Sequence, residues 1–480
     1  MASFPSPRSE AEVNAVLEEF ERRHRVFELT IGGMSLWRIL RFEISFTMQN
    51  LGLSRPMASK REILASMFSA ARQLFVAPGG TQYLGATMSS ALRTFDQRGW
   101  HDIYFDPIID AIGGGEKMLY VDAPGFEQHA RHAFRQPVFN DTSVVALSAV
   151  LGRIFGIRGH DDVFQALSQI IANDLGLSEF TAERIRRKYS VLIWRSWLYR
   201  IVLRRLRPGC VMIPNSGQFA LFLAARALGI PFVEMQHGIF SENHPDSLPA
   251  AALEFDRDSM LLPDILTVYG SWWGDLLKDS ALGRLGRIRE VGASWIESAR
   301  ALRLRQFSTD PDRPVVTLTS QGTGAEQVAD FIAAFLKLYS GALLFNIRLH
   351  PGYEIGTNHY DRFSDDERVK LWPGNSRPDT FEMIAMSDLH LSVSSACHYE
   401  ALGIGTPTGI LALPGHELVL DLARRNNAAL VDNPSALAMM VKKRSWPPIS
   451  DSISDQYFRG GHIDNIRALL SECRDMEKVK

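Results

Sequence analysis

The chain has 480 residues, 46% of them hydrophobic and 22% charged, and its formal net charge at pH 7 is −2. A chain of this length exceeds what one hydrophobic core can serve, so at least two domains are expected. The near-neutral charge excludes nucleic-acid binding by bulk electrostatic attraction, and no nucleic-acid partner is expected. Three cysteines far apart in the sequence, Cys210, Cys397 and Cys473, indicate a reducing compartment without a disulfide framework.

The first residues contain no apolar signal segment, and no stretch of about 18 uninterrupted apolar residues occurs. The sequence therefore predicts a cytoplasmic protein that does not cross a membrane. Apolar residues recur at helical spacing over residues 10–25, 37–48 and 57–75. We expect these segments to be helices added to the first domain. Two short apolar runs, at 82–88 and 117–121, are the first expected strands.

An aromatic and acidic segment lies between these two strands. Asp102, Asp106 and Asp110 recur every four residues, a spacing that would place them on one face of a helix. Pro107 argues against a continuous helix, because a proline inside a helix removes a hydrogen bond. We therefore expect a loop, whose carboxylates are solvated or, in the less favoured interpretation, meet a polar substrate.

Residues 184–207 predict a long helix in which basic and aromatic side chains alternate. Such a helix can lie on anionic lipid with its aromatic residues at headgroup depth, or it can pack against the domain and lead into the next strand. Packing is favoured, and peripheral contact with the inner face of the cytoplasmic membrane is a second expected role. The basic residues include Arg184, Arg186, Arg187, Lys188, Arg195, Arg200, Arg204 and Arg205, and the aromatic ones are Tyr189, Trp194, Trp197 and Tyr199.

The stretch 211–238 predicts a βαβ unit and hence a parallel sheet. A short apolar run is followed by a polar turn, a helix rich in alanine and leucine that ends at Gly229, and a second apolar run. Ligands bind beyond the carboxyl ends of such strands. His237 there can take a proton near neutral pH, or it can merely hydrogen-bond to its loop, and both interpretations stay open. The expected acceptor-side residues at the two strand ends are Asn215, Ser216, Gln236 and Gly238.

A charged stretch at 299–314 is the expected domain boundary. Beyond it, a second α/β alternation predicts strands at 315–319, 343–349, 389–393 and 408–413. A parallel sheet would bring the polar loops after the first three of these strands to one edge.

These three loops offer hydrogen-bond donors suited to phosphate. Two of them open a helix, where backbone N–H groups and the helix dipole favour an anion, although an ordinary capped turn gives the same pattern. Arg348 and His350 alternate along a strand, so both are expected to face the same way. Glu400 lies further along the last helix, where it can accept a hydrogen bond from a ribose hydroxyl. The predicted donor-binding residues are Ser320, Gln321, Gly322, Thr323, Arg348, His350, Pro351, Ser394, Ser395 and Glu400.

The segments QHG (236–238), RLHP (348–351) and SDLHLSVSSACHYEALGIGTP (387–407) together resemble GT-B glycosyltransferases of bacterial surface-polysaccharide synthesis. Their order is similar to that of the CDP-glycerol glycerophosphotransferases. The His-Pro and Ser-Ser pairs are also similar to those of bacterial sialyltransferases and Kdo transferases, which use CMP-activated sugars. The resemblance covers roughly residues 208–435. Gln236 departs from the tryptophan of the glycerophosphotransferases, and the acidic motif of the sialyltransferases is missing near Ser320.

The resemblance implies an α/β fold of the GT-B type, with two Rossmann-like parallel-sheet domains facing a central cleft and extra N-terminal helices. Residues 1–300 would form the acceptor side and residues 301–480 the nucleotide-donor side. His237 would act as the base, while the loop residues named above would hold the donor diphosphate. The implied activity is transfer of a sugar, or a glycerophosphate-like group, from a cytidine nucleotide to a growing glycan or lipid-linked glycan.

The loops contain no Asp-x-Asp metal motif, so we expect neither a metal nor another cofactor. Two other functions stay open. A non-catalytic GT-B scaffold in envelope glycan assembly would bind lipid or protein partners without binding nucleotide. A nucleotide-sugar epimerase would need a carboxylate placed for proton abstraction, and the sequence pairs none with His237.

Overall fold

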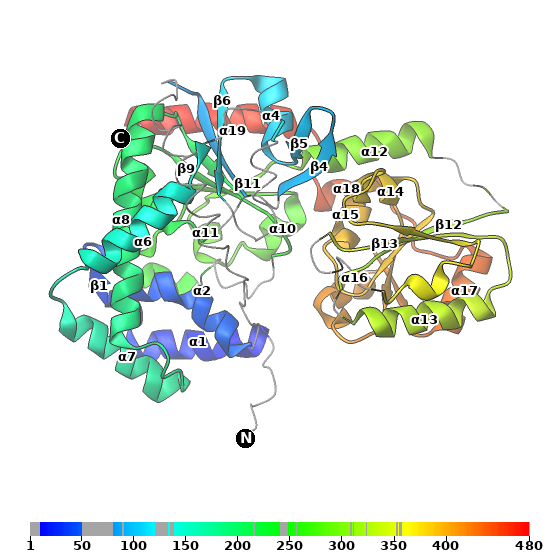
Figure 1. Ribbon diagram of the computed structural model, residues 1–480, viewed down its shortest axis with the longest axis horizontal. Helices are drawn as coiled ribbons and strands as arrows, with labels where there is room; N and C mark the ends of the chain where they lie inside the picture. Colours follow the sequence, from blue (N-terminus) through cyan, green and yellow to red (C-terminus); the bar gives the residue numbers. More distant parts are fainter. Residues whose placement is uncertain are drawn as a thin grey trace. The chain divides into compact units, whose positions relative to one another are not determined.

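The structure of the protein is a computed structural model (Figure 1). It describes residues 10–49, 80–88, 91–120, 133–134, 139–214, 217–240, 248, 250–255, 257–307, 310, 312–322, 324–351, 354 and 358–479. The chain separates into two compact units. Unit 1 comprises Met1–Val268, Trp273–Arg289 and Ile463–Lys480, and unit 2 comprises Tyr269–Trp272 and Glu290–His462. The functional assignments to residues 1–300 and 301–480 stay predictions.

Unit 1 is built on a seven-stranded sheet with the strand order β11-β10-β9-β8-β3-β6-β7. The pairs β3–β6, β3–β8, β6–β7, β8–β9 and β9–β10 are parallel. From β8, the later strands β9, β10 and β11 follow in chain order toward one edge of the sheet. From its neighbour β3, the strands β6 and β7 follow toward the other edge. The strands are β3 (Tyr83–Met88), β6 (Gly115–Tyr120), β7 (Phe139–Asn140), β8 (Val211–Ile213), β9 (Phe232–Met235), β10 (Ile265–Val268) and β11 (Ile288–Glu290).

The βαβ unit expected at 211–238 is confirmed. Strand β8 is fully buried, as expected of a short apolar run inside a covered parallel sheet. It is joined to β9 by helix α9 (Phe219–Arg226), and Gly229 after this helix has a φ of 71°, a conformation that favours glycine.

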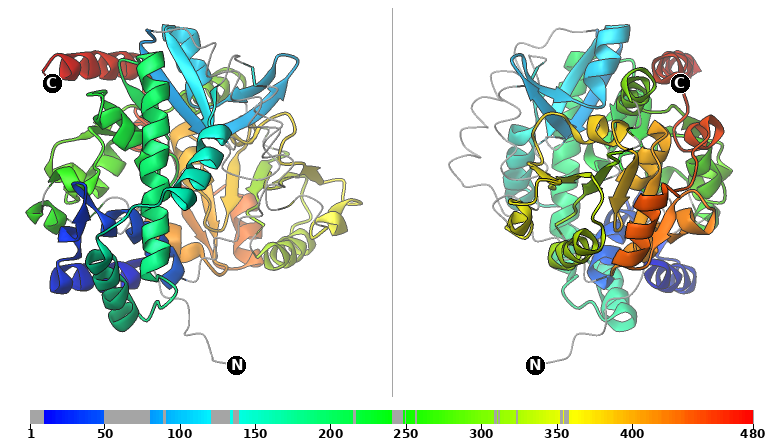
Figure 2. Two further views of the ribbon diagram at one scale, coloured as in Figure 1. Left: turned by 60° about the vertical axis from the view of Figure 1, so that its left-hand side comes forward. Right: turned by 90° about the vertical axis from the view of Figure 1, so that its right-hand side faces the viewer.

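Helices surround this sheet, and small antiparallel pairs accompany it (Figure 2). The helices expected near residues 10–25 and 37–48 are confirmed, whereas the expected helix at 57–75 lies outside the described residues. The long helix predicted at 184–207 is confirmed as α8. The elements are α1 (Glu10–His24), β1 (Thr30–Ile31), β2 (Met34–Ser35), α2 (Leu36–Met48), β4 (Leu92–Asp96), β5 (Gly99–Asp102), α4 (Phe105–Ile112), α6 (Thr142–Ile154), α7 (Asp161–Leu175), α8 (Ala182–Leu206), α10 (Ser271–Leu276), α11 (Ala281–Arg284) and α19 (His462–Val479).

The prediction of a loop around Pro107 is wrong. Helix α4 runs through this proline, which occupies its first turn, where the missing N–H group has no partner in any case. The prediction that the carboxylates of Asp102 and Asp106 are solvated is also wrong, because both side chains are buried. Lys117 Nζ of β6 lies 2.5 Å from Asp106 Oδ1, and Asp102 Oδ1 accepts from the backbone N–H of Tyr104 at 2.8 Å. Burial raises the pKa of Asp102.

Unit 2 is built on a six-stranded sheet with the order β14-β13-β12-β15-β16-β17, and all five neighbouring pairs are parallel. Numbered along the chain, the order is 3-2-1-4-5-6, the order of the dinucleotide-binding doubly wound fold. It reverses direction between β12 and β15. The strands are β12 (Val315–Thr319), β13 (Leu344–Arg348), β14 (Val369–Trp372), β15 (Leu389–Ser392), β16 (Thr408–Leu411) and β17 (Ala429–Val431).

Helices cover this second sheet. Helices α13 and α17 contact each other, and a second group is formed by α12, α14, α15 and α18. The core beside α13 contains fully buried Ile332, Phe335, Phe345 and Ile347. The prediction of an α/β protein with two parallel-sheet units and N-terminal helices is therefore confirmed. The helices are α12 (Ser294–Gln306), α13 (Ala325–Leu338), α14 (Thr380–Ala385), α15 (Cys397–Ile404), α16 (Leu420–Arg424), α17 (Pro434–Lys443) and α18 (Asp451–Tyr457).

Candidate functional site

The candidate site of unit 2 lies where the strand order reverses. Strands β12 and β15 are neighbours, and residues 320–324 and 393–396 follow their carboxyl ends. In open α/β sheets this is the position where a crevice forms and ligands bind, because the two connections leave toward opposite faces of the sheet. The sequence predicted both loops as phosphate-binding candidates, and the topology brings them together.

Direct hydrogen bonds join these two loops. Gln321 Oε1 accepts from the backbone N–H of Ser394 at 2.9 Å and from Ser394 Oγ at 3.3 Å. Two residues earlier in each segment, at the last residue of each strand, Ser392 Oγ donates to the carbonyl of Thr319 at 2.7 Å. Gln321 and Ser394 are both partly exposed, so this junction lies within reach of a ligand. Gly322 follows with a φ of 74°, and Thr323 lies outside the described residues.

Glu354 links the loop after β12 to the loop after β13. Its Oε1 accepts from Ser320 Oγ at 2.7 Å, and its Oε2 accepts from the backbone N–H of His350 at 2.6 Å. The Tyr360 hydroxyl lies 2.8 Å from the same Ser320 oxygen. Burial raises the pKa of Tyr360 to about 12, so this phenol stays protonated. Ser320 and Glu354 are buried, and the hydroxyl of Ser320 therefore serves the junction between the loops.

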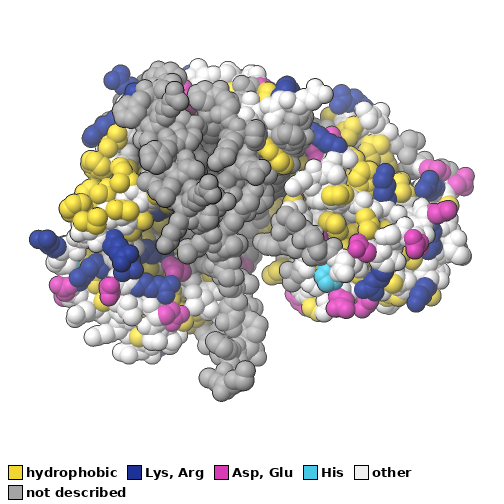
Figure 3. All heavy atoms as spheres, in the orientation of Figure 1, with side chains coloured by type: hydrophobic (Ala, Val, Ile, Leu, Met, Phe, Trp, Pro, Cys, Tyr) yellow, Lys and Arg dark blue, Asp and Glu magenta, His cyan; other side chains and the backbone are white. Residues whose placement is uncertain are grey.

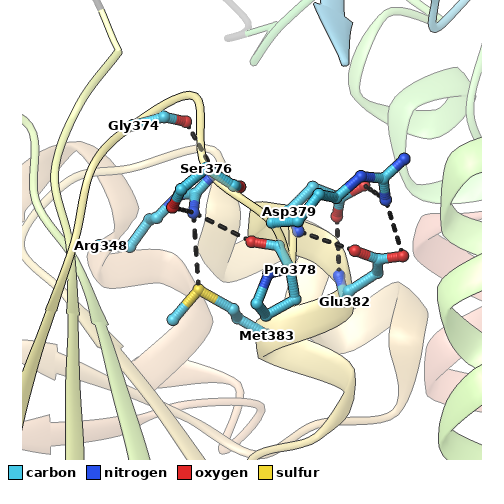
Figure 4. Close-up of polar contacts among 8 residues, drawn as sticks. Arg348, Gly374, Ser376, Pro378, Asp379, Glu382 and Met383 are labelled. Carbon is cyan, nitrogen blue, oxygen red and sulfur yellow. Dashed lines mark hydrogen bonds and ion pairs between the residues drawn. The ribbon is translucent and has the colours of Figure 1, made fainter. Parts of the chain in front are cut away.

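Arg348 has a different environment from the one expected from its spacing with His350. Its guanidinium is directed at the loop that follows β14, as Figure 4 shows. Nη2 donates to the carbonyls of Gly374 at 2.7 Å and Ser376 at 3.0 Å, and Nη1 donates to the carbonyl of Pro378 at 3.0 Å. Arg348 is buried, and this burial lowers the pKa of its guanidinium. Its observed contacts position a loop, and its role in donor binding stays a prediction.

The loop held by Arg348 packs closely on the His-Pro segment. A Cβ atom added to Gly374 would lie 2.4 Å from Pro351 Cα, so only glycine fits at this position. The loop ends at a capping box, in which Asp379 and Glu382 each accept from the other's backbone N–H. Arg377 Nη1 lies 2.8 Å from Glu382 Oε1 and is more than half exposed. No sequence motif pointed to Arg377, although its charge acts on Arg348 of the RLHP segment.

Ser395 and Glu400 are positioned by helix α15. The backbone N–H of Cys397, the first residue of the helix, donates to Ser395 Oγ at 3.2 Å, although the N-cap residue of α15 is Ala396. Glu400 lies in the first turn of α15 and is partly exposed. Burial, followed by the nearby charge of Glu400, raises the pKa of the Cys397 thiol to about 12, so this cysteine is a neutral packing residue.

A buried polar chain lies beneath the two loops. His390 Nε2 lies 2.9 Å from Thr319 Oγ1, and His390 Nδ1 lies 2.8 Å from Thr408 Oγ1. The same threonine oxygen lies 2.7 Å from His398 Nδ1. Burial lowers the pKa of His398 to about 4 and that of His390 well below its usual range, so both rings are neutral at physiological pH. This chain connects β12, β15, β16 and α15, and sequence reasoning did not identify it.

In unit 1, His237 lies at the carboxyl end of β9, as predicted. Gln236, the residue before it, makes two hydrogen bonds. Its backbone N–H donates to the carbonyl of Thr267 at 2.9 Å, and its side-chain amide donates to the carbonyl of Gly238 at 2.8 Å. The Tyr104 hydroxyl donates to the carbonyl of His237 at 3.5 Å, and the Phe240 ring lies 6.4 Å from the imidazole. His237 is partly exposed in a turn closed by Gln236.

The remaining predicted residues divide between the units. Asn215 and Ser216 lie outside the described residues, while Gln236 and Gly238 flank His237 in unit 1. All the described donor-binding candidates belong to unit 2. Among the residues that the structure describes, no three His, Cys, Asp or Glu side chains are grouped as a metal ion would require. Within the same residues, no helix combines the length and apolar character needed to cross a bilayer.

Comparison with known proteins gives similarity to solved structures. No protein-family model matches the chain, and no curated protein sequence matches it. The UDP-GlcNAc 2-epimerase from Neisseria meningitidis, solved with UDP-GlcNAc bound, is 16% identical with a TM-score of 0.46, over 81% of this chain and 99% of that one. MurG of Acinetobacter baumannii is 10% identical with a TM-score of 0.47, over 82% and 99% of the two chains. The wall teichoic acid polymerase TagF is 9% identical with a TM-score of 0.48, over 88% and 99%.

Proposed function

We propose that this protein is a transferase that moves a sugar, or a glycerophosphate-like group, from a nucleotide-activated donor to a growing surface glycan. The observation that carries the proposal is the junction of Gln321 with Ser394 at the point where the sheet of unit 2 reverses its order. Two loops with exposed polar donors meet there, one of them at the start of a helix of eight residues. Such an arrangement suits the diphosphate of a nucleotide.

The proposed roles in donor binding follow the contacts of each residue. Gln321, Gly322, Ser394 and Ser395 line the diphosphate, and Thr323 joins them by its place in the sequence. His350 and Pro351 border the same site, because Glu354 ties the His350 backbone to Ser320. Glu400 accepts a hydrogen bond from the ribose. Ser320 and Arg348 act as positioning residues through Glu354 and through the loop that ends at Pro378.

In the proposed reaction, a ring nitrogen of His237 takes the proton of the acceptor hydroxyl. The acceptor oxygen forms a bond to the transferred group as the bond between that group and the nucleotide phosphate breaks. The leaving nucleotide takes the bonding electrons, and the unit 2 donors stabilise its charge. In the proposal, these fixed hydrogen-bond donors take the place of a metal ion. The activated substrate is proposed to carry a cytidine nucleotide. The acceptor is a glycan or lipid-linked glycan, which would bring the protein to the inner surface of the cytoplasmic membrane.

The experiment that tests this function follows consumption of CDP- and CMP-activated donors with and without added glycan acceptor. A transferase releases free nucleotide at a rate that rises with acceptor concentration, and His237→Ala abolishes that rise. A new activated sugar formed without any acceptor would instead identify an epimerase. A scaffold would consume no donor under either condition.

A further inference from the structure

Helices α6 and α8 of unit 1 lie against each other closely enough to act as one surface. A Cβ atom added to Gly152 of α6 would lie 2.9 Å from Val191 Cα of α8, so glycine is required at this crossing. Arg195 Nε of α8 also donates to Ser148 Oγ of α6 at 3.2 Å. The buried residues of α8, among them Ile185, Tyr189 and Leu203, pack into unit 1. The remaining face of this helix pair is exposed.

The exposed face is apolar and is formed by both helices. On α8, Trp194, Trp197 and Ile201 are spaced by three and four residues, which places them on one side. Leu147, Val150 and Ile154 have the same spacing on α6. Hydrophobic side chains gather over these two helices at the left of Figure 3. The exposed fractions are 64% for Ile154, 59% for Phe155, 51% for Val150, 44% for Trp197 and Ile201, and 41% for Leu147.

Aromatic contacts make this face continuous across the two helices. The Trp194 indole N–H donates to the carbonyl of Phe155 at 3.1 Å, and the two rings lie 6.0 Å apart. The Trp194 and Trp197 rings are 5.8 Å apart and nearly perpendicular. Singly scattered apolar residues need no explanation on a protein surface, whereas a contiguous patch of this kind marks an interaction site.

Basic side chains of both helices border this face. Neither the segment 142–155 nor the segment 184–207 contains an aspartate or a glutamate. Near the start of α8, Arg184 and Lys188 are paired with Glu43 of α2. Arg186 is paired with Asp161 of α7, and Arg187 with Glu183 of α8 itself. Within the described part of the chain, no ion pair is found for the exposed side chains of Arg153, Arg204 and Arg207. The apolar face is therefore bordered by cations that no described protein carboxylate neutralises.

We infer that this α6–α8 face binds the surface of an anionic bilayer. Tryptophan is favoured at the interface between hydrocarbon and headgroups, and arginine beside it can pair with lipid phosphate. An apolar face with a basic border complements anionic lipid in both respects. The sequence predicted lipid contact through residues 184–207 alone, whereas the structure adds α6 and assigns Arg195 to the helix crossing. This inference does not depend on transferase activity, because binding needs neither donor nor acceptor.

The test is co-sedimentation of the full chain with phosphatidylcholine vesicles that contain or lack phosphatidylglycerol, at low and high salt. The parent protein is expected to bind the anionic vesicles, and more weakly at high salt. The double substitution V150S/I154S should abolish binding, and W197S serves as a second apolar variant. R153Q/R204Q should weaken binding at low salt by about 5-fold for each cation removed, which corresponds to about 1 kcal/mol per charge. L338S/L418S, which alters exposed leucines of unit 2, is the matched control and should bind like the parent.

Thermal unfolding of each variant checks that it is folded. Absence of parent binding to anionic vesicles, or equal binding by folded V150S/I154S and W197S variants, would overturn the inference. A parent protein that self-associates without lipid, and becomes monomeric in the same variants by sedimentation velocity, would also overturn it. The face would then be a contact between copies of the chain.

Discussion

The backbone N–H of Ser394 donates to the side-chain oxygen of Gln321 at 2.9 Å, and this bond joins the loops after the neighbouring strands β12 and β15. Its position matters because the strand order of unit 2 reverses between these two strands. Ser392 Oγ reinforces the junction by donating to the carbonyl of Thr319 at 2.7 Å. A ligand bound here would meet two loops that are already held in place, so little ordering free energy would be lost on binding.

Replacing His237 by alanine should abolish transfer and leave nucleotide affinity unchanged. A positioned general base contributes about 10²- to 10⁴-fold in rate, and we propose that this residue acts on the acceptor rather than on the donor. The measurement is the turnover number with a saturating activated donor, together with the calorimetric Kd for the free nucleotide. His359→Ala in unit 2 is the control. Turnover near the parent value in the His237 variant would remove this residue from the mechanism.

Replacing Arg348 by methionine should destabilise unit 2 far more than replacing its neighbour Arg377. Arg348 is buried and donates to three backbone carbonyls of the loop that ends at Pro378. Leaving these acceptors without a partner should lower the free energy of unfolding by about 3 kcal/mol. Arg377→Met, which breaks partly exposed ion pairs, should cost at most about 1 kcal/mol. Denaturant unfolding of the two variants compares them, and equal losses would contradict the role given to Arg348.

The stability of unit 2 should fall as the pH decreases from about 6.5 toward 4. Burial lowers the pKa of His398 to about 4 and that of His390 well below its usual value. In this range the unfolded chain binds protons that the folded chain does not, so acidification favours unfolding. Unfolding midpoints across this range should show a smaller decrease for His398→Gln than for the parent. His416→Gln, on a half-buried ring, is the control, and an unchanged pH slope in the His398 variant would exclude the buried ring as the cause.

The loops at the reversal point could be predicted from the sequence because both signals are local. Short apolar runs predicted the strands, and the polar turns that follow residues 319 and 392 predicted the loops. Sequential α/β alternation then implied that these turns share one edge of a parallel sheet. His237 was found for the same reason, since it directly follows a buried strand.

The contacts that depend on distant partners could not be predicted. The alternation of Arg348 with His350 described the strand, but it did not show that the long arginine side chain reaches carbonyls at 374, 376 and 378. Asp106 was expected in solvent because nothing local indicates that its partner is Lys117 of strand β6. The charged stretch at 299–314, the expected domain boundary, begins inside α12, which extends to Gln306. Arg300 there pairs with Asp451 and Asp455 of α18.

The claim that unit 2 holds the nucleotide is tested most directly by isothermal titration of CMP, CDP, UDP and GDP into the parent protein and into Gln321→Ala and Ser394→Ala. Ser450→Ala, which removes a serine cap from α18 of the same unit, is the control. We expect a cytidine nucleotide to bind most tightly, and each junction variant to lose about 1.5–3 kcal/mol of binding free energy, roughly 10- to 150-fold in Kd. The control should bind like the parent. Failure of all four nucleotides to bind the folded parent, or unchanged affinity in both junction variants, would contradict the account.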